Sequence, residues 1–286
     1  MTVATPSAEP MVAYQPPASP EAPVVFDAPH SGRHYPADFG AAVSQHLLEG
    51  GEDRFVDELL ADAPAQGAHL VVARFARTYI DPNRGLDDID QALLSEPWPL
   101  PVDSRNAAQG TALVFRVIGE AVPIYDRKLS VAEVESRIRR CYLPYHARLQ
   151  STLDRVHRRH GQVWYVDWHS MTSVGNRLSP DLGRPRADFV LGDRDGSTCA
   201  PAFTEHVAEA LRNLGYTVAI NDPYKGAELV ARHGQPLCGR HALQIEMRRG
   251  LYMDEESLEK HEGFPKLKTD LKTLSGRICD FARKAA

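Results

Sequence analysis

The sequence predicts an α/β fold with a mixed, mostly parallel sheet and helices on both faces. Short segments rich in β-branched and aromatic residues alternate with longer segments of helical periodicity. Strands separated by helices tend to pair in parallel, because a parallel connection needs a crossover of a dozen or more residues. With 286 residues, 43% of them hydrophobic, the chain can bury one substantial core.

The predicted elements follow one another in a regular order. Six strands are expected over residues 24–26, 69–73, 163–166, 189–191, 217–220 and 243–245. Four helices are expected over residues 53–61, 131–159, 201–214 and 265–284. Ser130 and Glu133 match a capping box at the start of the long helix, and Pro144 is expected to kink or divide it.

The chain shows one domain preceded by a short lead-in. Residues 1–22 contain five prolines among many alanines and serines, which is typical of a flexible or loosely packed segment. Residues 23–286 show no internal repeat and no linker, so they are predicted to form a single domain. Within it, residues 97–110 lack periodicity and are expected to be a surface loop of the kind that can close over a site.

The charge, hydrophobicity and cysteine content of the chain exclude several classes of binding partner. The net charge is −5 and the basic residues are spread along the chain, which argues against nucleic acid and anionic membranes as partners. No apolar run approaches the roughly 20 residues that span a bilayer. The four cysteines lie far apart and are expected to be free thiols. We therefore expect a cytoplasmic protein that acts on a small molecule, as a monomer or small homo-oligomer.

Polar side chains follow several predicted strands at one edge of the sheet. In open α/β sheets, ligands bind beyond the carboxyl ends of the strands. Four segments deliver polar residues there: His30 after the first strand, Asp81, Asn83 and Arg84 after the second, Asp167 and His169 after the third, and Glu246 and Arg248 after the last.

His30, His169 and a carboxylate have the composition of a catalytic zinc site. Zinc in hydrolases takes three protein ligands and keeps a fourth position for water, whose pKa falls to about 7. The helix after His30 begins near the same edge, so Asp53 in its first turn is the expected third ligand. Asp57 is the reserve, and position alone does not separate Asp53 from Glu52. A first-turn acid also stabilises a helix, so a structural role for Asp53 is the alternative.

Glu246 is the candidate general base. Burial at the end of an apolar strand raises a carboxyl pKa towards neutral pH, which suits proton transfer. The alternative is a carboxylate that only pairs with Arg248 or Arg240.

Three arginines in turn-rich segments are candidates for binding a substrate carboxylate. A guanidinium group clamps a carboxylate through two parallel hydrogen bonds, and Arg84, Arg127 and Arg177 are placed to offer one. Each of them is also compatible with an ordinary surface arginine. Together they point to an acidic substrate.

Nine short motifs, in order and spacing, resemble the N-formylglutamate amidohydrolases, also called N-formylglutamate deformylases. The resemblance covers nearly all of the chain after residue 22. The motifs are PHSGRHYP, EDRFVDEL, RTYIDPNR, IYDRKL, PYHARL, VDWHSM, ADFVLGDRDG, NDPYKGAELV and GRHALQIEMRRGLYMDE.

This resemblance implies a cytoplasmic bacterial enzyme of histidine degradation that hydrolyses N-formyl-L-glutamate to formate and L-glutamate. It implies a divalent metal, Zn²⁺ or another such as Co²⁺, and a phosphorylase/hydrolase-like sandwich similar to that of zinc carboxypeptidases. By that similarity, Asn83 and Arg84 would hold a substrate carboxylate and Glu246 would be the base. One feature departs from the carboxypeptidase pattern: its H-x-x-E pair is absent, because Arg33 stands three residues after His30.

A dicarboxylate substrate needs a second anchor. Arg127, Arg177, Tyr224 or Lys225 is expected to hold the other carboxylate and to neutralise the oxyanion. Two other functions fit the same residues. One is a metal-dependent hydrolase of another N-acyl amino acid, a short peptide or a cell-wall amide. The other is a metal-free binding protein for acidic metabolites.

Overall fold

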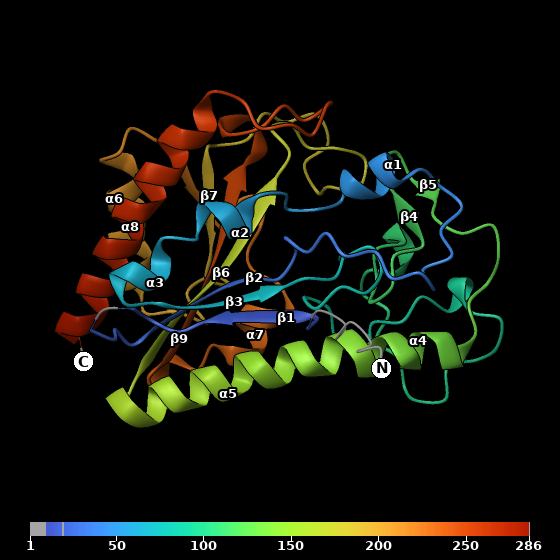
Figure 1. Cartoon of the computed structure of the whole chain (residues 1–286), viewed down its shortest axis with the longest axis horizontal. Helices are drawn as coiled ribbons and strands as arrows, with labels where there is room; N and C mark the ends of the chain where they lie inside the picture. Colours follow the sequence, from blue (N-terminus) through green and yellow to red (C-terminus); the bar gives the residue numbers. More distant parts are fainter. Residues whose placement is uncertain (1–9, 19, 286) are drawn as a thin grey trace, which may run out of the picture.

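The protein is built around a seven-stranded mixed sheet (Figure 1). The computed structural model describes residues 10–18 and 20–285. Across the sheet, the strands lie in the order β1 (Val12–Gln15), β3 (His69–Ala73), β2 (Val24–Ala28), β6 (Val163–Met171), β9 (Arg240–Arg248), β7 (Phe189–Gly192) and β8 (Val218–Ile220). Strands β3, β2, β6 and β9 run parallel, as do β7 and β8, whereas β1 and β7 are antiparallel to β3 and β9. The predicted fold class is confirmed.

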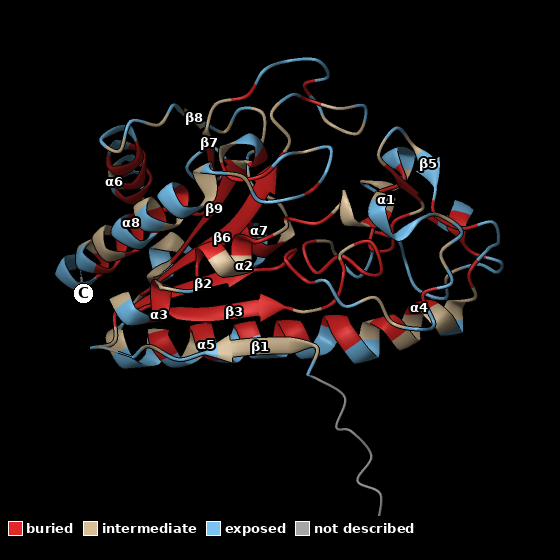
Figure 2. Ribbon diagram, turned by 45° about the horizontal axis from the view of Figure 1, so that its top comes forward, coloured by how far each residue is buried: buried red, intermediate tan, exposed pale blue. Residues whose placement is uncertain are grey.

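Helices cover both faces of the sheet. One face packs against α2 (Val56–Leu59), α3 (Ala63–Gln66), α6 (Pro201–Arg212) and α8 (Gly263–Ala285). The other packs against α4 (Val131–Arg137), α5 (Leu143–His160) and α7 (Glu228–His233). Figure 2 shows the central strands fully buried between these layers. The exposed residues lie on the outer sides of the helices and in the loops.

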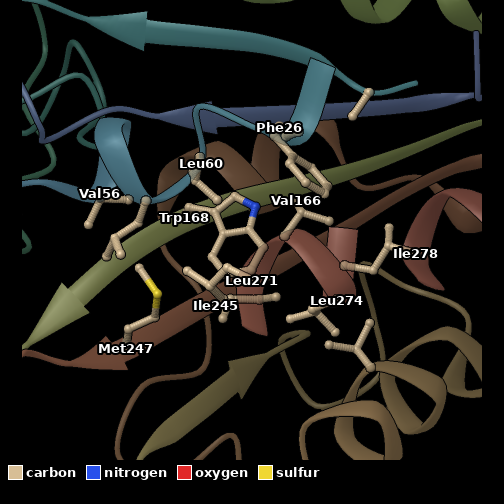
Figure 3. Close-up of a cluster of buried hydrophobic side chains, with 14 of the residues drawn as sticks. Phe26, Val56, Leu60, Val166, Trp168, Ile245, Met247, Leu271, Leu274 and Ile278 are labelled. Atoms are coloured by element: carbon tan, nitrogen blue, oxygen red, sulfur yellow. The ribbon is translucent and has the colours of Figure 1, made fainter. Parts of the chain in front are cut away.

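Alternation along β6 separates the core from the polar residues of the site. Trp168 packs among Phe26, Leu60 and Ile245 on the face covered by α2 and α8 (Figure 3). Because neighbouring side chains of a strand point to opposite faces, Asp167 and His169 on either side of Trp168 point to the other one. The apolar positions of β6 therefore fix where its polar positions lie.

Four strands are longer than predicted: β2 and β7 extend to Ala28 and Gly192, and the larger differences, at β6 and β9, concern the site. The predictions for residues 163–166 and 243–245 stop where polar residues begin, but β6 and β9 continue to Met171 and Arg248. His169 and Glu246 thus lie inside paired strands and not at their tips. They are also register partners on neighbouring strands, which places their side chains side by side on one face.

The expected lead-in was wrong for residues 12–15. These form the edge strand β1, which pairs with β3 and is half-buried. Proline is tolerated next to an edge strand, so the proline content of this segment does not argue against a strand there. The rest of that prediction falls partly on residues 1–9 and 19, which lie outside the described part of the chain.

The helix predictions were right in position and differ in extent. The predicted helix over residues 53–61 is only α2, preceded by Phe55 at a φ of 65°, so Asp53 lies in the turn before it. The long helix is divided as expected: a π-helical turn, Ile138–Tyr142, separates α4 from α5 and ends two residues before Pro144. The capping box at Ser130 and Glu133 is present.

Several short elements were not predicted from the sequence. They are α1 (Gln45–Glu49), α3, α7, the β4–β5 ribbon (Val117–Ile118 and Val122–Pro123) and the 3₁₀ turns Gln91–Leu93, Ala107–Gln109, Pro236–Cys238 and Arg249–Leu251. All four cysteines are free, as expected. No helix within the described residues is long and apolar enough to cross a membrane.

Candidate metal centre

Three buried side chains converge on one point at the carboxyl edge of the sheet. The Nδ1 atoms of His30 and His169 lie 3.0 Å apart, and Oδ2 of Asp53 lies 3.3 Å and 3.2 Å from them. The three residues are at most 3% exposed. Ligands of a tetrahedral zinc ion, bound at 2.0–2.1 Å, lie about 3.3 Å apart. The triangle therefore has the dimensions of a three-ligand metal site.

The second nitrogen of each histidine is held by a carboxylate. Nε2 of His30 lies 2.7 Å from Oδ1 of Asp81, and Nε2 of His169 lies 2.8 Å from Oδ1 of Asp167. A carboxylate on the far nitrogen fixes the imidazole so that its other nitrogen presents a lone pair to a metal. Both histidines therefore aim Nδ1 at the same point.

Local backbone geometry brings His30 and Asp53 together. The backbone N–H of Asp53 donates to the carbonyl of His30 at 3.0 Å. After His30 the chain turns at Gly32, where a Cβ atom would lie 2.2 Å from the carbonyl oxygen of Phe75. Only glycine fits this close approach of the loop after β2 to the segment after β3.

Asp53 is held ionised by cationic neighbours. Burial opposes its ionisation, but hydrogen bonds with His169 and His30 and the nearby charge of Arg77 outweigh it, and its pKa lies well below the usual value. The Arg249 guanidinium donates to Oδ1 at 3.0 Å, which leaves Oδ2 facing the histidines.

The donor set fits a divalent metal. Burial disfavours a charged His169, yet Asp167 and Asp53 raise its pKa well above the usual value, so this pocket favours positive charge at the ring. The two Nδ1 atoms lie 3.0 Å apart, and a carboxylate oxygen of Asp53 lies beside both. Without a shared cation, these three buried acceptor atoms cannot all have a favourable partner. Histidine nitrogen and carboxylate oxygen are ligands that zinc accepts.

The two reserve ligands are engaged elsewhere. Glu52 accepts hydrogen bonds from Tyr35 and from Arg54, and Asp57 pairs with Arg33 at 3.2 Å. Of the three acids considered from the sequence, Asp53 is the one that the fold brings to the histidines.

Glu246 is the candidate base beside this centre. Glu246 is 8% exposed and lies on β9 directly across from His169. Burial is the main cause that raises its pKa to about 7, helped by the charge of Asp53 and opposed by His169. Gln244 donates to Oε1 at 2.9 Å and holds the carboxylate in place.

Two arginines of the centre were missed from the sequence. Arg77 donates to Oδ2 of Asp81 through Nε and NH2, at 3.2 and 2.7 Å, and its NH1 lies 4.0 Å from Oδ1 of Asp53. Arg249 donates to Asp53 and to Ser170. The RTYID motif gave a signal for Arg77, because Asp81 stands four positions after it in the segment that follows β3.

The side chains of Asn83 and Arg84 form hydrogen bonds within the protein that the sequence did not predict. The Asn83 amide donates to Asp167, lies 3.2 Å from Nε2 of His169, and accepts from the backbone of Leu229. Arg84 donates to the carbonyls of Thr111 and Asn83. Asn83 therefore supports His169 from behind, and its amide is already satisfied.

The remaining predicted anchors divide into two pairs. Arg127 is exposed and pairs with Glu133, and Lys225 is exposed and pairs with Asp195, so the structure supports neither at the centre.

Tyr224, on the segment after β8, lies near Glu246, whereas Arg177 lies on the loop between β6 and β7. Tyr224 stacks under the Arg186 guanidinium at 5.1 Å, and the nearby charge of Glu246 adds to burial in raising its pKa. Arg177 is exposed on the adjoining loop.

Substitution of Asp81 tests whether the carboxylates on the far nitrogens of the two histidines contribute to metal binding. Asp81→Asn is expected to weaken metal binding about 10–100-fold, because the amide no longer polarises Nε2 or fixes its proton. Competition with a chromogenic chelator measures the change. Asp38→Asn, at an exposed surface carboxylate, serves as the control and should bind metal as the wild type does. Equal affinity for the Asp81 variant would contradict this role.

The fold and the centre define an α/β protein with a candidate metal site at the carboxyl edge of its sheet. Residues 22–253 match the family model of N-formylglutamate amidohydrolase, and the chain belongs to that family.

Similar proteins carry the same family name. The chain is 28% identical to the N-formylglutamate deformylase of Pseudomonas putida over 244 residues, which cover 82% of each chain. The crystal structure of N-formylglutamate amidohydrolase from Ralstonia eutropha JMP134 is 48% identical, with a TM-score of 0.91 over 96% of this chain and 99% of that one. A protein from Agrobacterium tumefaciens, 21% identical with a TM-score of 0.67 over 95% and 96% of the two chains, shares the fold.

Proposed function

We propose that the protein hydrolyses N-formyl-L-glutamate to formate and L-glutamate with a divalent metal, Zn²⁺ or Co²⁺, held by His30, Asp53 and His169. The observation that carries the proposal is the convergence of these three ligand atoms directly beside a buried carboxyl group, Glu246, whose pKa is raised to about 7. A bound divalent metal would polarise the formyl carbonyl and make a water molecule more acidic. The family and the names of similar proteins support the substrate.

Glu246 moves the proton in this proposal. As a carboxylate it takes a proton from the attacking water, and as a carboxylic acid it gives that proton to the glutamate nitrogen when the C–N bond breaks. A pKa near 7 suits both steps, because neither protonation state is strongly disfavoured at neutral pH. Gln244 keeps the carboxylate on the side of His169.

Arg77 supplies the positive charge opposite the reacting carbonyl. Two of its nitrogens are fixed on Asp81, so NH1 faces the centre without freedom to turn away. A preorganised donor of this kind stabilises the negative charge that develops on the carbonyl oxygen. We assign this part of the reaction to Arg77 in place of Arg127 or Lys225.

Arg77→Lys is expected to lower kcat about 10²–10³-fold with metal content unchanged, because lysine keeps the charge and loses the rigid fork. Arg155→Lys on α5 is the matched control, since its guanidinium contacts Tyr14 far along the sheet edge. Wild-type kcat in the Arg77 variant would contradict the assignment. Steady-state kinetics and metal analysis of the same samples give both quantities.

The amino-acid part of the substrate is assigned to the region of Tyr224 and Arg177. Arg186 is fixed by two hydrogen bonds to Asp181 and holds the Tyr224 ring near Glu246. We assign one substrate carboxylate to the Tyr224 hydroxyl, which also contacts Ser179, and the other to the exposed Arg177.

The experiment that tests the proposal compares turnover of three substrates by the metal-loaded protein: N-formyl-L-glutamate, N-formyl-L-aspartate and N-acetyl-L-glutamate. We expect N-formyl-L-glutamate to have the highest kcat/KM. The shorter acid should lose at least about 100-fold, because one charged group then stays unpaired. Equal or faster turnover of either analogue would assign a different N-acyl amino acid as the substrate.

A further inference from the structure

The acidic ligand of the candidate metal centre lies on a different chain segment from His30. In the H-x-x-E pattern of the carboxypeptidases both ligands belong to one segment, whereas here the chain runs through α1 before it returns with Asp53. Asp53 lies in the turn before α2 and not inside a helix. The position of its side chain therefore depends on contacts with other segments.

The guanidinium group of Arg249 provides such contacts. Its NH2 donates to Oδ1 of Asp53 at 3.0 Å. Its NH1 donates to the carbonyl of Gly50 at 2.9 Å, and its Nε donates to Oγ of Ser170 at 3.1 Å. Arg249 is 7% exposed, so these hydrogen bonds are largely shielded from water and are stronger for it. Because each of its three nitrogens has an acceptor, the guanidinium group is fixed in one orientation.

The acceptors of Arg249 belong to the two segments that carry Asp53 and His169. Gly50 precedes Asp53 in the segment between α1 and α2, and Ser170 directly follows His169 on β6. One side chain thus holds two ligand-bearing segments at a fixed separation. A lysine ammonium group is a single point and does not reach three acceptors arranged around a planar fork.

The two carboxylate oxygens of Asp53 have different partners. Oδ2 lies 3.3 Å and 3.2 Å from the Nδ1 atoms of His30 and His169. Oδ1 accepts from Arg249 and lies 4.0 Å from NH1 of Arg77. A carboxylate binds a metal through one oxygen or through both. Because a charge-assisted hydrogen bond holds Oδ1 and reduces the negative charge that it offers, these contacts favour binding through Oδ2 alone.

The number of oxygens that Asp53 offers decides how many positions remain on the metal. A hydrolytic zinc site has three protein ligand atoms and one open position for water. With Oδ2 alone, His30, Asp53 and His169 supply three ligand atoms. With both oxygens they supply four, and a tetrahedral site has no open position left.

We propose that Arg249 is a positioning residue that restricts Asp53 to metal binding through Oδ2 and so preserves the open position. Arg77 does not replace it, because two of its nitrogens are fixed on Asp81 and the third lies 4.0 Å from Oδ1 of Asp53. Arg249 touches neither the metal nor the substrate and acts through Asp53. Its effect on coordination concerns the centre itself, and its effect on turnover rests on the proposed function.

The visible absorption of the Co²⁺-loaded protein tests the proposal, because four-coordinate Co²⁺ absorbs more strongly than five-coordinate Co²⁺. We expect the strong spectrum from the wild type. Arg249→Met should still bind Co²⁺ fully at saturation and should show the weaker spectrum, because Asp53 then turns both oxygens to the metal. The matched control is Arg248→Met, at the neighbouring arginine that pairs with Asp188, and its spectrum should equal that of the wild type.

Two kinds of result would overturn the proposal. A weak, five-coordinate spectrum of the wild type would show that no tetrahedral position is preserved, and this measurement does not depend on the folding of any variant. An Arg249→Met protein that keeps the wild-type spectrum, or that only binds Co²⁺ more weakly, would show that Arg249 anchors the segment without controlling how Asp53 binds.

Kinetics at saturating metal test the consequence for turnover. Arg249→Met is expected to lower kcat at least about tenfold, because the position for water is filled, and Arg248→Met should leave kcat unchanged. An altered spectrum with the wild-type kcat would overturn the connection between the open position and turnover. If the wild type does not hydrolyse N-formyl-L-glutamate, the proposed function fails, and the Co²⁺ spectra still decide the role of Arg249.

Discussion

Asp53→Asn is expected to leave a folded protein that binds less than a tenth of the metal bound by the wild type and has no measurable turnover. An amide oxygen is a neutral, weaker ligand than a carboxylate, and the substitution also removes the charge that pairs with Arg249. The loss of charge acts on both histidines, because Oδ2 of Asp53 lies within 3.3 Å of each Nδ1 atom.

The matched control for this variant is Asp57→Asn. Asp57 lies four residues later and pairs with Arg33 on the outer side, so its variant should keep full metal content and turnover. Metal analysis after dialysis, with circular dichroism to verify folding, makes the comparison. If the Asp57 variant lost the metal and the Asp53 variant kept it, the ligand set would be wrong.

Glu246→Gln is expected to lower kcat roughly 10²–10⁴-fold while metal content stays at the wild-type level. Glutamine keeps the shape of the side chain and its contact with Gln244, but it takes up no proton. Glu256→Gln, at an exposed carboxylate, is the control and should behave as the wild type does. A Glu246 variant with reduced metal content and normal turnover per bound metal would show that this residue is not the base.

The pH dependence of kcat/KM follows from the ionisation of Glu246. A base must be ionised to accept a proton, so kcat/KM of the wild type should rise with pH and reach half its plateau near pH 7, where burial has moved the pKa of Glu246. Below that pH, the carboxyl group is protonated and turnover falls about tenfold per pH unit. The residual activity of Glu246→Gln should lack this limb.

The sequence predicted the fold well where residue pattern decides it. Buried strands such as His69–Ala73 were predicted with the correct bounds, because a short apolar run bounded by turn residues is typical of a buried strand. His30 and His169 were identified because a polar residue at the end of an apolar run is unusual. The lengths of β6 and β9 were underestimated, since Asp167, His169 and Glu246 face a buried polar layer that local pattern does not reveal.

Long-range contacts explain the residues that were missed or misplaced. Arg248 and Arg249 are adjacent and chemically identical, yet Arg249 reaches Asp53 across the fold whereas Arg248 pairs with Asp188. Arg127 resembles a carboxylate clamp in sequence but pairs with Glu133 at the start of α4. Which arginine reaches the centre depends on the packing of distant segments.

Formate release by the metal-free protein, before and after addition of one equivalent of Zn²⁺, tests the central claim most directly. We predict no turnover of N-formyl-L-glutamate by the chelator-treated protein and full turnover at one zinc per chain, with neither metal binding nor activity restored in Asp53→Asn. A metal-free protein that releases formate at the wild-type rate would contradict the claim. So would a zinc-loaded protein that releases none.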